Sequence, residues 1–164
     1  MRNFVRSIGL FRPLADQGDA DAQTTLGIMY QAGHGVPKDD AQAVKWFRLA
    51  ADQGHARAQT SLGTMYASGL GVPQDYAQAA KWFRLAADQA NAWAQGMLGI
   101  MYQAGDGVPQ DYVEAHKWFN LSAAWEPDAD IRERAVKARD ELASMMTPAQ
   151  VAEAQKRASA WQPK

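Results

Sequence analysis

The stretch LGIMYQAGHGVP, residues 26–37, decides the fold because it returns twice in nearly the same form. It reads LGTMYASGLGVP at residues 62–73 and LGIMYQAGDGVP at residues 98–109, so each copy begins 36 residues after the one before. A fixed period of this length is typical of arrays of stacked units rather than of one closed core. The repetition therefore predicts a repeat architecture.

One unit, residues 18–53, reads as two helices joined by a tight turn. Gly33 and Gly35 stand where a helix end needs a positive φ. Pro37 then prevents the first helix from resuming. Apolar residues recur at helical spacing on both sides of the turn. They are Ala22, Leu26, Met29 and Tyr30 before it, and Ala43, Trp46, Phe47 and Ala50 after it. We expect these aromatic residues, and their equivalents in the other copies, to be core residues.

An aspartate begins each second helix and predicts a capping box with the residue three positions later. The pairs are Asp39 with Gln42, Asp75 with Gln78, and Asp111 with Glu114. Near the end of the chain, Thr147 and Gln150 predict a further box, with Pro148 in the first turn of the helix.

A lone helix pair cannot bury both of its faces, so neighbouring pairs stack, and about three repeats are the practical minimum. The sequence therefore predicts one all-α domain, a right-handed superhelical solenoid of helix-turn-helix repeats. Its predicted parts are a partial repeat at 1–17, complete repeats at 18–53, 54–89 and 90–125, and C-terminal capping helices at 126–164.

Composition excludes several classes of function. The formal net charge of −1 over 164 residues provides no general attraction for nucleic acid. The absence of cysteine rules out disulfides and thiolate metal sites. No apolar run approaches the length of a membrane span. We expect a soluble chain, cytoplasmic as written and periplasmic or secreted if a signal peptide has been removed.

The repeated residues resemble the Sel-one-like repeat (SLR) family, a relative of the tetratricopeptide repeats. The first unit fills the family pattern with Ala20, Ala22, Leu26, Gly27, Tyr30, Gly33, Gly35, Val36, Asp39, Ala43, Trp46, Ala50 and Ala51. The second unit fills it equally well, and the third departs from it at Ser122. The resemblance implies an adaptor that binds other proteins on the concave surface of the superhelix and needs no cofactor.

No catalytic, metal-binding or cofactor-binding motif emerges from the residues. His34, His55 and His116 occupy three different repeat positions and form no His-Glu-x-x-His pattern. No serine is followed three residues later by lysine, as penicillin-binding enzymes require. The glycine turn lacks the lysine of a phosphate loop. Binding or hydrolysis of β-lactams therefore remains only a weak alternative.

The positions that vary between repeats indicate where a partner could bind. One stripe on the first helices is mostly polar in units one and two but reads Trp93, Met97 and Ile100 in unit three. An apolar anchor with a polar border is typical of protein interfaces. The predicted partner-binding residues are Ile28, Gln31, Arg57, Thr64, Trp93, Met97, Ile100 and Gln103. The alternative is that Trp93 and Met97 pack beneath the C-terminal helices.

The N-terminal helix resembles a second helix whose own first helix is missing, because FRPLADQG at 11–18 is similar to FRLAADQG at 47–54. We expect Phe4, Ile8 and Phe11 to lack the packing partner of a full repeat. The alternative function is therefore a self-associating structural unit, a homodimer formed through these three residues.

Overall fold

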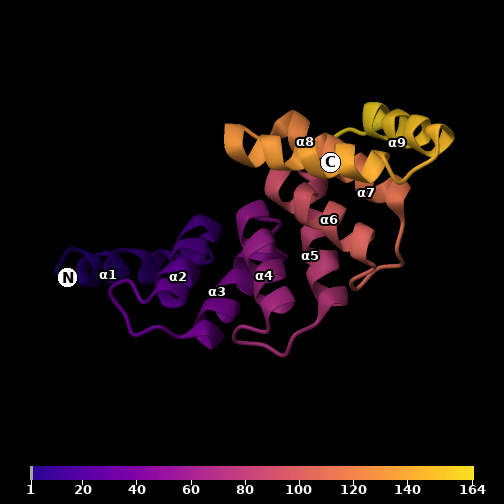
Figure 1. The fold of residues 1–164 in the computed structure, drawn as a ribbon. Coiled ribbons are helices and arrows are strands. Elements are labelled where there is room, and N and C mark those ends of the chain that lie inside the picture. The colour runs from indigo at the N-terminus through magenta and orange to yellow at the C-terminus, as the bar shows by residue number, and fades with distance from the viewer. Residues whose placement is uncertain (1) are drawn as a thin grey trace. The chain divides into compact units, whose positions relative to one another are not determined.

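The protein is described by a computed structural model that covers the backbone of residues 2–164 and the side chains of residues 8–164. Within residues 2–164 every regular element is an α-helix (Figure 1). The helices are α1 (Arg2–Asp16), α2 (Ala20–Ala32), α3 (Asp40–Asp52), α4 (Ala56–Ser68), α5 (Tyr76–Asp88), α6 (Ala92–Ala104), α7 (Tyr112–Trp125), α8 (Ala129–Ala143) and α9 (Pro148–Ala160). They form two units, Met1–Trp82 and Phe83–Lys164, which are described separately.

The second helix of each pair keeps the 36-residue period to the end of the chain. Helices α3, α5, α7 and α9 begin at Asp40, Tyr76, Tyr112 and Pro148. The last pair, α8 and α9, therefore has the spacing of a repeat although its residues lack the glycine turn. The 36-residue period of the helices therefore extends into α8 and α9, where the sequence motif is absent.

The caps explain where the helices begin and end. The Asp39 carboxylate accepts a hydrogen bond from the Gln42 amide at 2.9 Å, and Gly33 ends α2 with a φ of 71°. The full capping box of Thr147 and Gln150 is confirmed. The reciprocal half of the box is wrong for Asp39, because its own amide donates to the Tyr30 carbonyl at 2.9 Å. That bond joins the two helices of the pair.

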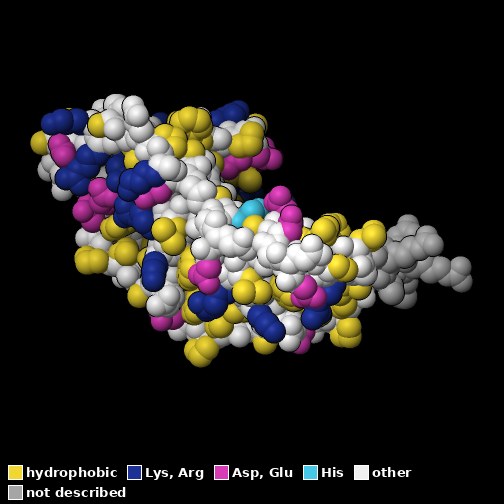
Figure 2. Space-filling view, turned by 180° about the vertical axis from the view of Figure 1, so that it is seen from behind, with side chains coloured by type: hydrophobic (Ala, Val, Ile, Leu, Met, Phe, Trp, Pro, Cys, Tyr) yellow, Lys and Arg dark blue, Asp and Glu magenta, His cyan; other side chains and the backbone are white. Residues whose placement is uncertain are grey.

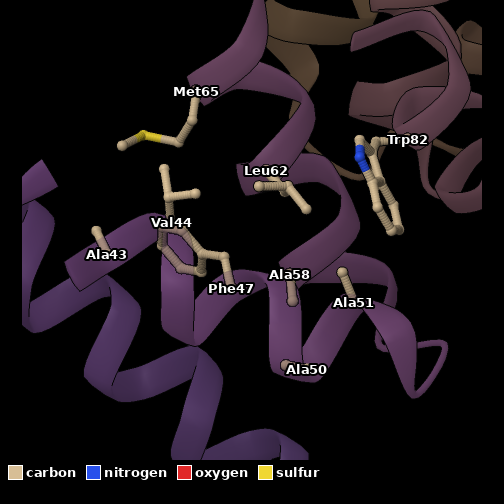
Figure 3. Close-up of a cluster of buried hydrophobic side chains, with 9 residues drawn as sticks. All are labelled: Ala43, Val44, Phe47, Ala50, Ala51, Ala58, Leu62, Met65 and Trp82. Atoms are coloured by element: carbon tan, nitrogen blue, oxygen red, sulfur yellow. The ribbon is translucent and has the colours of Figure 1, made fainter. Parts of the chain in front are cut away.

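A phenylalanine ring of the second helix lies directly on a glycine of the first. A Cβ atom placed on Gly27 would come within 2.5 Å of the Phe47 ring, and one on Gly99 within 2.6 Å of the Phe119 ring. Phe47 is fully buried in the cluster of Figure 3, together with Leu62 and Met65. The prediction that the repeated tryptophans and phenylalanines form the core is confirmed.

Two polar contacts recur with the repeat and were not expected from the sequence. The side-chain amides of Gln23, Gln59 and Gln95 donate to the carbonyls of Ala15, Ala51 and Ala87, at 3.0 to 3.2 Å. The guanidinium groups of Arg48 and Arg84 donate to the hydroxyls of Tyr66 and Tyr102. Each contact ties a second helix to the first helix of the next repeat.

Ile8 and Phe11 of the N-terminal helix are half-buried, whereas Val44 and Phe47 at the corresponding repeat positions are buried. Ile8 and Phe11 pack against the cluster that contains Leu26 and Trp46. Phe4 lies outside the described side chains. Among the described side chains of α1, the exposed large apolar residues are Leu10 and Leu14.

The C-terminal helices are tied to α7 by charged groups. Glu114 accepts from Lys117 at 2.7 Å and from Arg157 of α9 at 3.0 Å. Burial alone would raise the pKa of Glu114, but these two cations outweigh that effect and leave the pKa below its usual value. On the α8 side, Arg139 donates to Asn120 at 3.2 Å. These contacts fix α8 and α9 on α7.

We predict that Gly27→Ala destabilises the protein even though alanine is the better helix former. The new methyl group would overlap the Phe47 ring, at a cost of about 1–3 kcal/mol that exceeds the gain in helix propensity of about 1 kcal/mol. The measurement is the free energy of unfolding from urea titration. Gly9→Ala in α1 is the matched control, because no atom lies within 4 Å of its added Cβ. A stability gain at both positions would show that the Phe47 ring does not constrain the helix pair.

We also predict that His116 makes the protein less stable in mild acid. Burial lowers its pKa below the ordinary 6.5, and the nearby charge of Arg139 lowers it further, while Asp140 opposes them. The unfolded chain therefore binds the proton at a higher pH than the folded chain does. The contribution of neutral His116 to folding stability is fully present above the pKa of the unfolded state. It is lost as the pH falls from 6.5 through the lower pKa of the folded state.

The test compares free energies of unfolding at about pH 7.5 and about pH 5.5, which bracket the histidine range. His116→Val introduces the residue that stands at the corresponding position 44. This variant is expected to lose part of the pH dependence, and His34→Ala, at an exposed position, is expected to retain it. An unchanged pH dependence in His116→Val would contradict the assignment.

Candidate functional site

A groove of about 320 Å³ lies in the Phe83–Lys164 unit, between α6 and α8. Both helices pack against α7, which forms the floor of the groove through the buried residues Phe119 and Ser122. The walls are formed by Trp93, Gly96, Met97 and Ile100 of α6 and by Ile131, Arg134, Ala135 and Ala138 of α8. Arg134 is the only charged residue in this lining.

The α6 wall follows from the spacing of its residues. Trp93, Met97 and Ile100 stand at i, i+4 and i+7, so they share one face of the helix. The opposite face is buried through Leu98 and Met101. Asn91 sets the start of the helix by accepting from the Ala94 amide at 2.9 Å.

The α8 wall is built in the same way. Asp128 caps the helix by accepting from the amides of Asp130 and Ile131, each at 3.0 Å. Ile131, Ala135 and Ala138 then share one face at i, i+4 and i+7. Because two of the three are alanines, the wall is low and leaves space between the helices.

The structure places Trp93 and Met97 at the edge of the groove between α6 and α8. Trp93 and Ile100 keep 49% and 51% of their surface exposed, and Met97 is half-buried. The Trp93 and Ile100 side chains are therefore not covered by the C-terminal helices, whereas Met97 is partly buried in the groove. Neither are they independent of them, because α8 supplies the opposite wall of the groove.

In the Met1–Trp82 unit the corresponding strip between successive first helices, called the seam here, is bridged by polar side chains. The His55 ring spans from α4 to α2, with Nδ1 3.1 Å from the Thr24 hydroxyl and Nε2 2.9 Å from the Asp21 carboxylate. Further along, the Gln31 amide donates to the Met65 sulfur at 3.4 Å. This seam is closed by its own side chains.

The residues that make the His55 bridge are replaced at the third repeat, and Gln103 keeps the place of Gln31 while Lys137 takes that of Met65. Trp93 and Gly96 occupy the positions of Asp21 and Thr24, and Pro127 occupies that of His55. Among the side chains of residues 8–164, no hydrogen bond or ion pair joins α6 to α8. The seam between α6 and α8 is therefore open and apolar.

Gly96 and Ser122 together shape the floor. The Ser122 hydroxyl donates to the Ala92 carbonyl at 2.9 Å, so its polar group is already satisfied within the protein. A Cβ atom on Gly96 would lie 3.2 Å from that hydroxyl oxygen. The glycine thus makes room for the serine and leaves the floor free of any polar group that needs a ligand.

The other predicted binding residues are placed apart from the groove. Gln103 lies near the end of α6, where its carbonyl accepts from the Gln110 amide at 2.8 Å. Ile28 packs against the core cluster of the first unit. The Thr64 hydroxyl donates to the Thr60 carbonyl at 3.0 Å, and Arg57 is exposed. Gln103 is in the same unit as the groove, whereas Ile28, Gln31, Arg57 and Thr64 belong to the Met1–Trp82 unit.

Sequence reasoning missed the residues of the α8 wall and the floor. Ile131, Arg134 and Ala135 have no counterpart in the repeat pattern. The sequence did contain one signal for the floor. Gly96 replaces the threonine of the other two repeats, and Ser122 replaces their alanine.

Metal-ligating side chains do not cluster within residues 8–164, and two of the histidines have structural positions. No group of three His, Asp or Glu side chains within residues 8–164 could hold a metal ion. His55 caps α4, and His116 is buried in α7. None of the helices in the described part has the length and apolar character needed to cross a bilayer. On the face shown in Figure 2, acidic and basic side chains lie beside one another, so that face carries no broad region of one charge.

Comparison with known proteins identifies the fold. The Sel1 repeat family matches residues 20–55, 56–91 and 94–124. A Sel1 repeat protein from Oxalobacter formigenes is 37% identical, with a TM-score of 0.70 over 80% of this chain and 98% of that one. The predicted all-α helical-repeat solenoid is thereby confirmed.

A second solved structure is similar over most of this chain. It is c5321, a protective antigen of uropathogenic Escherichia coli with an SLR fold, which is 29% identical with a TM-score of 0.69. The match covers 94% of this chain and 40% of the antigen. A comparison with curated proteins found no match. Sel1 repeat proteins are generally non-catalytic scaffolds for protein–protein interaction. With three Sel1 repeats over residues 20–124, this chain belongs to the Sel1 repeat family.

Proposed function

We propose that the protein binds a protein or peptide partner on the side formed by its first helices, the side predicted to be concave, and that the groove between α6 and α8 is the main contact. The observation that carries this proposal is the exposed pair of Trp93 and Ile100 beside an apolar cavity. Large apolar side chains around a preformed pocket are typical of the residues that dominate binding energy.

The composition of the groove supports this role. A partner side chain that enters it would cover the Trp93 ring and the Met97 thioether, and methionine adapts to irregular apolar surfaces. Because the floor is buried and the helices are fixed on α7, little ordering is needed on binding. Gln103, on the same helix as Trp93 and Ile100, is assigned to the polar border of the surface.

Self-association through α1 is a second candidate, favoured by one observation. Leu10 is 70% exposed and Leu14 is 48% exposed, although they stand at the positions of the buried residues Trp46 and Ala50. The described part of the α1 face that a full repeat would bury is therefore apolar and exposed at Leu10 and Leu14. Light scattering tests this candidate. If a second copy docks there, the apparent molecular mass rises with protein concentration, and Leu10→Glu abolishes that rise.

We predict that Trp93→Ala/Ile100→Ala abolishes partner capture from an extract of the source cell while leaving the helix content unchanged. Both side chains are half exposed, so their loss removes contact surface with little loss of core packing. Loss of two such anchors typically costs more than about 2 kcal/mol of binding energy. The measurement is affinity capture followed by identification of the retained proteins, with helicity checked by circular dichroism.

Trp125→Ala is the matched control. Trp125 is 52% exposed in the same unit but does not line the groove. Its loss is expected to leave the captured set unchanged. If the double variant captures the same proteins as the wild type, the groove is not the binding site.

A further inference from the structure

Arg134 gives the groove a chemical preference. We infer that the segment bound between α6 and α8 is an acidic, apolar peptide segment whose Asp or Glu side chain pairs with Arg134 while its apolar side chains fill the groove. This inference rests on the proposed function, because it names the partner chemistry for the same site.

The first support is that Arg134 forms no hydrogen bond or ion pair within the described residues, in contrast to the other cations of α8. Arg132 donates to the Glu126 carbonyl at 3.2 Å. Lys137 lies 3.9 Å from Glu141, and Arg139 lies 2.8 Å from Asp140. Among the side chains of residues 8–164, no carboxylate lies within ion-pair distance of Arg134.

The second support is the surroundings of the guanidinium group. Helix α6, which forms the facing wall, contains no charged residue. The floor residue Phe119 is apolar, and the hydroxyl of Ser122 is already bonded. Arg134 is thus an exposed positive charge at the edge of an otherwise apolar lining, and neither Asp130 nor Glu133 of its own helix forms an ion pair with it.

The third support is the energetic consequence of filling the groove. Arg134 is exposed, so an entirely apolar occupant that packs against its guanidinium group would remove water from that group without offering an acceptor, which is costly for a charged group. A carboxylate restores the lost hydrogen bonds and can bind both edges of the planar guanidinium. The groove therefore disfavours apolar segments without an acid as well as favouring those with one.

The position of Arg134 limits where the acid must be. It follows Ile131 by three residues and precedes Ala138 by four, so it lies within one helical turn of the apolar lining on both sides. A bound peptide that reaches both must carry its acidic residue within a few positions of its apolar anchor.

Selection of random peptides displayed on phage tests the inference with the complete chain. We expect the wild type to enrich peptides with an Asp or Glu next to large apolar residues, and Arg134→Glu to enrich Lys or Arg at that place instead. For a synthetic enriched peptide, replacing the acid by its amide is expected to weaken binding about tenfold in calorimetry, and the same replacement is expected to have little effect on Arg134→Ala.

Arg132→Glu is the matched control, because it makes the same charge change on α8 outside the groove lining. It is expected to select the same peptides as the wild type, and circular dichroism checks that every variant is folded. One outcome would overturn the role of Arg134 and leave the proposed function standing. In that outcome the enriched peptides show no preference for acidic residues, and they no longer bind the Trp93→Ala/Ile100→Ala variant. Peptides that bind this double variant as well as the wild type, or no enrichment at all, would overturn both.

Discussion

The contact on which the structure depends is a phenylalanine ring seated on a glycine of the facing helix. Gly27 under Phe47 and Gly99 under Phe119 leave no room for even a methyl group, so both pairs close to the same distance. The geometry within a helix pair determines which helix faces are left to contact the neighbouring pairs. Residues 36 positions apart therefore have equivalent surroundings, and any difference in sequence becomes a difference in surface at a known place.

The candidate binding site is a product of this constraint. In the first unit the seam between α2 and α4 is bridged by His55, which contacts Asp21 and Thr24. The corresponding residues of the third repeat are Trp93 and Gly96, Pro127 stands in place of His55, and α6 and α8 each pack on α7. A groove thus arises where a repeat loses its bridging side chains and keeps its helix positions. Its apolar lining and the unpaired charge of Arg134 then define what it can bind.

Most of the fold could be predicted from the sequence, because turns, caps and apolar stripes are local signals that occur three times. The groove wall at Trp93 was also predictable, since it breaks a pattern that the other repeats keep. Arg134 was not, because α8 retains the spacing of a repeat without its sequence motif. The reciprocal capping at Asp39 was predicted wrongly because its amide is bonded to Tyr30, a contact between helices that no local pattern shows.

Whether the seam between α6 and α8 is open can be measured directly by NMR, from the relaxation of methyl groups by a soluble paramagnetic agent. The methyl groups of Ile100 and Ile131 line the groove, whereas Met65 and Leu142 are fully buried. An open seam predicts strong relaxation of the first pair and protection of the second. If Ile100 and Ile131 are as protected as Met65, the seam is closed and the groove is not available to a partner.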